Sequence, residues 1–268
     1  MSYLQALIIA IIEGITEFLP ISSTAHMKLA NPLLHITESP FTNLFEVVIQ
    51  LAAIFSVVII YWKKFIDFKN VAFYFKLIVA MIPAIILGVL LKKHIDSALS
   101  NLTFISCVMI VGGVILLFID KIFNRLTIIE EEKISYSKAF IIGCFQSLSI
   151  IFPGLSRSAA TIIGGMSQKL TRKLAAEFSF FLAVPTMFAA SVKSFWDVYK
   201  ENPEVIAKDN MSILAVGGVI SFFVALLAIK FFISYVTKNG FRLFGWYRII
   251  LGTSFLIYLF MVASRATE

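Results

Sequence analysis

The sequence predicts an all-α integral membrane protein with six spans, built as an inverted-topology repeat within one membrane domain. Hydrophobic residues make up 59% of the 268 residues, whereas soluble globular chains contain roughly 45 to 50%. Six apolar segments are long enough to cross a bilayer, and two pairs of shorter apolar segments are each divided by a stretch containing proline and serine. Each half would therefore consist of one re-entrant helical hairpin followed by three transmembrane helices.

The charge pattern fits a membrane protein better than a nucleic-acid-binding one. The formal net charge is +7, but the lysines and arginines lie in short loops between apolar segments and form no single patch, so we expect no nucleic-acid partner. Basic loops of this kind are typical of the cytoplasmic side of a membrane protein. The expected partners are membrane lipids, and the sequence is compatible with a homodimer without requiring one.

The first half, about residues 1–120, opens with the segments 3–18 and 21–33. Each is shorter than the roughly 20 residues that a spanning helix needs. Pro20 ends the first segment, because its ring removes a backbone hydrogen-bond donor. Three segments of spanning length follow, at about 42–62, 72–91 and 101–119.

The second half, about residues 136–268, repeats this plan. The polar stretch at about 121–135, with its acidic run at 130–132, is interpreted as the linker. The segments 136–151 and 155–168 on either side of Pro153 form the second predicted hairpin. The remaining spans are predicted at about 172–193, 211–234 and 243–263.

Three spans per half is an odd number, and a re-entrant hairpin returns to the side from which it entered. The second half must therefore be inserted upside down relative to the first. The loops richest in lysine and arginine are assigned to the cytoplasm. Both termini and the mouth of the first hairpin would then face outward, the second hairpin would enter from the cytoplasm, and the two tips could meet in the middle of the membrane.

The first hairpin concentrates ionisable side chains at membrane depth, where they usually mark a functional site. Glu13 and Glu17 are four residues apart and would project from one face of a helix. His26 on the second arm lies at a similar depth, so it can face Glu17 across the hairpin. Between them stand hydroxyl residues that can cap the second helix: Ser22, Ser23 and Thr24.

The stretch Pro153 to Thr161 in the second half is the counterpart of the turn in the first hairpin. Placing Pro153 over Pro20 sets Gln146 against Glu13 and Ser156 against Ser23. Arg157 follows the serine, and its planar guanidinium suits phosphate oxygens. The two halves thus show the same plan with different chemistry.

Together these groups indicate a phosphate site with a metal. Helices that begin after Ser22 and Ser156 would direct their positive ends at an anion. Glu13 and Glu17 would repel that anion unless a divalent cation, Mg²⁺ or Ca²⁺, bridges them to a diphosphate. His26 can act as a general acid or base, or attack phosphorus itself. The alternatives are a purely structural ion pair with Arg157, and a transporter or lipid flippase built on the same inverted repeat.

Two stretches resemble the signature motifs of the undecaprenyl-diphosphate phosphatase family, also called the bacitracin-resistance family. They are EGITEFLPISSTAH at 13–26 and PGLSRSAATI at 153–162. FSFFLAVPT at 178–186 resembles a third family segment. The resemblance implies a hydrolase that removes the terminal phosphate of undecaprenyl diphosphate at the outer face of the bacterial inner membrane. That reaction would recycle the lipid carrier for peptidoglycan synthesis and confer resistance to bacitracin.

The resemblance also implies roles for individual residues. The implied catalytic residues are Glu13, Glu17, Ser23, His26 and Arg157, with Glu13 and Glu17 as metal ligands. The implied substrate-binding residues are Ser22, Thr24, Ser156, Ser158 and Thr161. The sequence departs from the family pattern at Ala25 and Ala159, where glycine is usual, and a methyl group is tolerable there inside a helix. Another class of lipid phosphatase needs a second histidine after its SR motif, and no histidine follows His94 in this chain.

Overall fold

The computed structural model describes residues 1–206 and 208–265, and its regular elements in this part are helices, with one isolated parallel β-bridge between Ile128 and Leu170. The all-α class is therefore confirmed. The first half contains α1 (Tyr3–Thr16), α2 (Ser23–Leu33), α3 (Pro40–Ile60), α4 (Trp62–Phe65), α5 (Val71–Leu90), α6 (Lys92–Leu99) and α7 (Leu102–Ile122). The second half contains η1 (Glu131–Lys133), α8 (Tyr136–Ile151), α9 (Arg157–Ser167), α10 (Arg172–Glu201), η2 (Pro203–Ile206), α11 (Lys208–Asn239) and α12 (Arg242–Arg265).

Six of the described helices are long and apolar enough to cross a membrane: α3, α5, α7, α10, α11 and α12. They correspond to the six predicted spans. Helix α10, with 30 residues, and α11, with 32, are longer than predicted, because they continue through polar residues that end the apolar pattern without ending the helix. The short helices α4 and α6 lie in connections where no helix was predicted.

The two predicted hairpins are present as α1 with α2 and α8 with α9. Each second helix begins at a serine whose hydroxyl accepts a hydrogen bond from a main-chain N–H, at 3.3 Å for Ser22 and 3.2 Å for Ser156. Both serines have positive φ angles, 70° and 76°, a conformation that L-residues seldom adopt and that costs roughly 1–3 kcal/mol. Ser156 therefore corresponds to Ser22, and the predicted match with Ser23 was wrong by one residue, because the turn after Pro153 is one residue longer than the turn after Pro20.

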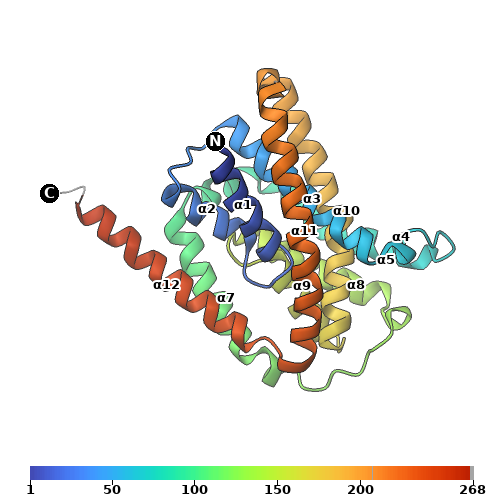
Figure 1. Cartoon of the computed structure of the whole chain (residues 1–268). Coiled ribbons are helices and arrows are strands. Elements are labelled where there is room, and N and C mark those ends of the chain that lie inside the picture. The colour runs from blue at the N-terminus through green and yellow to red at the C-terminus, as the bar shows by residue number, and fades with distance from the viewer. Residues whose placement is uncertain (207, 266–268) are drawn as a thin grey trace.

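The helices of the two halves pack against each other in a crossed pattern. Helix α1 packs against α11, and in the corresponding way α8 packs against α5. Helix α7 lies beside its counterpart α12, as Figure 1 shows at the lower left, and α3 lies against its counterpart α10. Such reciprocal packing, in which a helix meets its counterpart or a pair of helices is matched by the pair of their counterparts, is what a two-fold relation between the halves predicts. The inversion of the second half in the membrane stays a prediction.

Arg248 of α12 connects the two hairpin turns to each other. Its side chain is completely buried. The guanidinium donates hydrogen bonds to main-chain carbonyl oxygens of Pro20 (3.1 Å), Gly154 (2.8 Å), Leu155 (2.7 Å) and Met109 (3.2 Å). Gly112 of α7 makes room for it, since a Cβ atom there would lie 2.3 Å from Nη2. Carbonyl groups that the helices leave unpaired at both turns thus find donors inside the protein.

The basic loops gather at one end of the molecule. Asp120, at the end of α7, accepts hydrogen bonds from Arg172 Nε at 2.7 Å and from the main-chain N–H of Phe241 at 2.9 Å. The linker joins the same end, where Lys64 pairs with Glu131 at 2.5 Å. The loops that the charge pattern assigns to the cytoplasm therefore lie together.

Single-cysteine labelling tests the predicted orientation. After Cys107 and Cys144 are replaced by serine, a cysteine in place of Lys63 or Lys238 is expected to react with an impermeant reagent only from the cytoplasmic side, and a cysteine in place of Lys200 only from outside. All three lysines are exposed, so a lack of reaction from one side reflects the membrane. Labelling of position 238 from outside would reverse the assignment.

Candidate functional site

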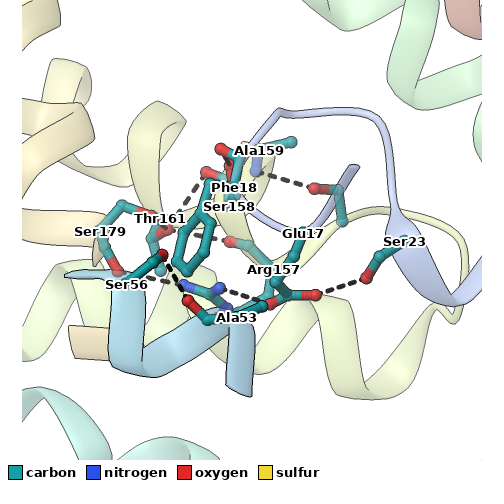
Figure 2. A network of polar contacts seen from close by, with 11 residues as sticks. Glu17, Phe18, Ser23, Ala53, Ser56, Arg157, Ser158, Ala159, Thr161 and Ser179 are labelled. Atoms are coloured by element: carbon teal, nitrogen blue, oxygen red, sulfur yellow. Dashed lines mark hydrogen bonds and ion pairs between the residues drawn. The ribbon is translucent and has the colours of Figure 1, made fainter. Parts of the chain in front are cut away.

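The tips of the two hairpins meet at an ion pair between Glu17 and Arg157. Figure 2 shows the Glu17 carboxylate between Arg157 and Ser23: Arg157 Nη2 donates to Oε1 at 2.8 Å, and Ser23 Oγ donates to Oε2 at 2.5 Å. Both charged side chains are largely buried: the exposed fraction is 5% for Glu17 and 14% for Arg157. Removing one partner of a buried pair typically costs 3–5 kcal/mol, because the other charge is left uncompensated. The pair therefore fixes the two hairpins relative to each other.

Behind this pair, a layer of hydroxyl groups holds α9 against α10 and against the first turn. Arg157 Nη1 donates to the carbonyl of Ser179 at 3.1 Å, and the hydroxyls of Thr161 and Ser179 lie 2.6 Å apart. Ser158 Oγ donates to the carbonyl of Phe18 at 2.9 Å. Thr161 and Ser158 are completely or almost completely buried. Their hydroxyls are thus engaged within the protein, and a direct role in substrate binding stays a prediction.

A cavity of about 220 Å³ opens in front of the ion pair. Six of the predicted site residues line it: Glu17, Ser22, Ser23, Thr24, Ser156 and Arg157. The other lining residues are Gln50, Gln146, Ser149, Ile150, Thr186, Met187 and Ala190. Because Ser22 and Ser156 are the N-caps of α2 and α9, both helices begin at the cavity and direct the positive ends of their dipoles toward it.

Several polar atoms around the cavity are buried without a hydrogen-bond partner among the described residues. These are both amide atoms of Gln146, the hydroxyl of Thr186 and Nε of Arg157. A buried polar group left unpaired costs roughly 1–3 kcal/mol, so such groups in a native structure usually serve a ligand or a bound water. The sequence places Gln146 opposite Glu13 and leaves open whether it helps to orient the site or only packs between helices; its signal is a glutamine in an otherwise apolar segment.

Glu13 lies deeper than the cavity wall. It is completely buried, neither carboxylate oxygen has a hydrogen-bond partner in the described part of the chain, and the charges that act on it are those of Glu17 and, more weakly, Glu46. The unpartnered oxygens of Glu13 fit a divalent cation, which would share the oxygens of Glu17 with Arg157 and Ser23. The described residues form no cluster of three His, Cys, Asp or Glu side chains, so water and phosphate oxygens would have to complete the coordination, as is common for Mg²⁺.

His26 is held outside the cavity wall. Its Nδ1 lies 2.7 Å from the carbonyl oxygen of Ser22, and its Nε2 lies 2.8 Å from the hydroxyl of Tyr247, whose ring is stacked on the imidazole. A carbonyl can only accept, so Nδ1 carries a proton, and in the neutral ring Nε2 accepts from Tyr247. Both ring nitrogens are therefore engaged, and the predicted contact of His26 with Glu17 is not formed. Tyr247 was missed because nothing in the sequence places it near residue 26.

Comparisons with known proteins identify the family of this chain. The chain matches the family model described as bacitracin resistance protein BacA over residues 6–254. It is 53% identical to an undecaprenyl-diphosphatase of Flavobacterium johnsoniae and 52% identical to one of Flavobacterium psychrophilum, over 98% of each chain. It is 46% identical to an undecaprenyl-diphosphatase of Bdellovibrio bacteriovorus, over 97% of each chain. The similarity extends over both hairpins and all six long helices, and the chain therefore belongs to the bacitracin resistance protein BacA family.

Proposed function

We propose that this chain is an integral-membrane phosphatase that hydrolyses undecaprenyl diphosphate to undecaprenyl phosphate and inorganic phosphate. The observation that carries this proposal is the cavity at the hairpin tips, where Glu17, Arg157 and the serine-capped starts of α2 and α9 meet. The similarity to undecaprenyl-diphosphatases over nearly the whole chain supports the substrate. In a bacterium, this reaction would recycle the lipid carrier for peptidoglycan synthesis and confer resistance to bacitracin.

The residues of the cavity suit the charge that develops in phosphate-anhydride hydrolysis. An oxygen atom from water bonds to the terminal phosphorus, the bond from that phosphorus to the bridging oxygen breaks, and the bridging oxygen leaves with the lipid phosphate. Arg157 and the N–H groups that begin α2 and α9 would stabilise the negative charge on the phosphoryl oxygens. The hydrogen bond from Ser23 to Glu17 gives the proton of the attacking water a path: the water would pass it to Ser23 Oγ while Ser23 passes its own proton to the Glu17 carboxylate.

A divalent cation, Mg²⁺ or Ca²⁺, is part of this proposal. Glu13 and Glu17 would hold it, and the unpartnered oxygens of Glu13 supply the reason. When bound, the cation would neutralise the diphosphate and polarise its phosphorus–oxygen bonds. It would also relieve the repulsion between the two buried carboxylates, which otherwise face each other with Arg157 paired to only one of them.

We also propose that the site opens toward the outer face of the bacterial inner membrane. Helices α8 and α10 both begin beside the linker, where the main-chain N–H of Thr171 donates to the carbonyl of Ile128. On α8 the buried Gln146 is followed by the half-buried Ser149, and on α10 the cavity residue farthest from that end, Ala190, is exposed. This pattern supports an opening away from the basic loops.

A phosphate-release assay with purified protein tests the function. The wild-type chain is expected to release phosphate from a polyprenyl diphosphate, whereas a flippase would bind the lipid without releasing any. Arg157→Lys should lower kcat/KM by roughly 100-fold, because a point charge cannot replace a planar fork that contacts two oxygens. Arg242→Lys, at an exposed position, is the matched control. Near-normal activity of Arg157→Lys would reduce Arg157 to a structural role.

The metal is tested by removing it. A chelator should abolish phosphate release, and added Mg²⁺ or Ca²⁺ should restore it. Glu13→Gln should raise the cation concentration needed for half-maximal activity by about 10-fold or more, since a neutral amide is a weaker ligand than a carboxylate. Glu38→Gln, on the surface, should leave that concentration unchanged. Full activity in the chelator would refute the proposed cation.

The direction of opening is tested in sealed vesicles of known protein orientation. Substrate placed only in the leaflet that corresponds to the outer face is expected to be hydrolysed, because the exposed end of the cavity lies away from the basic loops. Substrate confined to the cytoplasmic leaflet should remain intact over the same period. Hydrolysis only from the cytoplasmic leaflet would show that the cavity opens inward.

A further inference from the structure

Two uncharged polar side chains that line the cavity are unpaired in the part of the chain that the structure describes. Gln146 of α8 is 1% exposed, and neither of its amide atoms has a partner among the described residues. Thr186 of α10 lines the same cavity, and its hydroxyl is also buried and without a partner in that part of the chain. Neighbouring hydroxyls such as Ser147 differ, because Ser147 Oγ donates to the carbonyl of Gly143 at 3.1 Å.

We propose that Gln146 and Thr186 bind the phosphate group that stays attached to the lipid. This inference rests on the function proposed above, and it assigns the two phosphates of the substrate to the two halves of the cavity. The terminal phosphate lies with Arg157 and the starts of α2 and α9. The lipid-attached phosphate lies against Gln146 and Thr186.

The chemistry of the two side chains suits a phosphate. The amide group of Gln146 offers two N–H donors, and the hydroxyl of Thr186 offers a third. Phosphate oxygens are acceptors, so each of these donors gains a partner when the substrate binds. The cavity volume of about 220 Å³ is several times the roughly 30 Å³ that one water molecule occupies in the liquid. The space therefore suits a group larger than a single water molecule.

The path to the membrane fixes which phosphate lies there. The lipid-attached phosphate must be the one nearer the route by which the prenyl chain leaves. On α8 and α10, the buried Gln146 is followed by the half-buried Ile150, and Met187 by the exposed Ala190. The apolar Ile150, Met187 and Ala190 therefore connect the unpaired groups with more exposed parts of α8 and α10. Glu17 and Arg157 are instead joined to Ser23 and Ser179.

Equilibrium binding to purified protein tests the assignment, with farnesyl phosphate standing for the lipid-attached phosphate and inorganic phosphate for the terminal one. Gln146→Met and Thr186→Val keep the size of each side chain and remove its donors. Neither change breaks a hydrogen bond recorded within the protein, so both variants should fold. Each should raise the Kd for farnesyl phosphate by about 10-fold or more, as expected for a lost hydrogen bond to a charged group.

The Kd for inorganic phosphate should change by less than about twofold, and Ser147→Ala should leave both constants unchanged. An equal increase in Kd for the two ligands would place Gln146 and Thr186 at the terminal phosphate and overturn the proposal. Unchanged binding of farnesyl phosphate in both variants would also overturn it. Because binding is measured without turnover, the proposed function can fail separately. In that case the wild type would bind farnesyl phosphate but release no phosphate from farnesyl diphosphate.

Discussion

Arg248 is the contact on which the arrangement of both hairpins depends. A re-entrant turn exposes main-chain carbonyls at a depth where the bilayer offers no water to bond them. Arg248 supplies donors to such carbonyls in both turns and in α7 at once, and the carbonyl dipoles in return surround a buried positive charge. Helices α2 and α9 start directly after these turns, so the positions of Ser22 and Ser156 follow from this one side chain.

The ion pair between Glu17 and Arg157 completes that arrangement from the other side. Arg248 holds the main chains of the turns together, whereas Glu17 and Arg157 join their side chains across the tips. The pair is neutral as a whole, so the cavity can receive an anion only through donors that remain free. Those donors are the helix starts, Arg157 Nε and the unpaired groups of Gln146 and Thr186. In the proposed function, the protein would therefore contribute mainly dipoles to phosphate binding, and the cation would contribute positive charge.

Much of the fold could be predicted because apolar length and helix-breaking residues are local properties of the sequence. The six spans and both hairpins depend on them, and so do the N-caps at Ser22 and Ser156. The register between the halves was wrong by one residue because turn length is not encoded in the helices on either side. Arg248 and Tyr247 could not be assigned, since their partners lie far away in the sequence. An arginine near the start of a span is expected at the membrane surface, and only the packed structure shows that the side chain of Arg248 points inward.

The position of Arg248 in the chain also decides when the site can form. Its partner Pro20 lies 228 residues earlier, and Arg248 belongs to α12, the final helix. During synthesis the first hairpin is made long before this donor, and its turn must wait until α12 has entered the membrane. A nascent or truncated chain that lacks α12 therefore cannot brace its turns with this side chain.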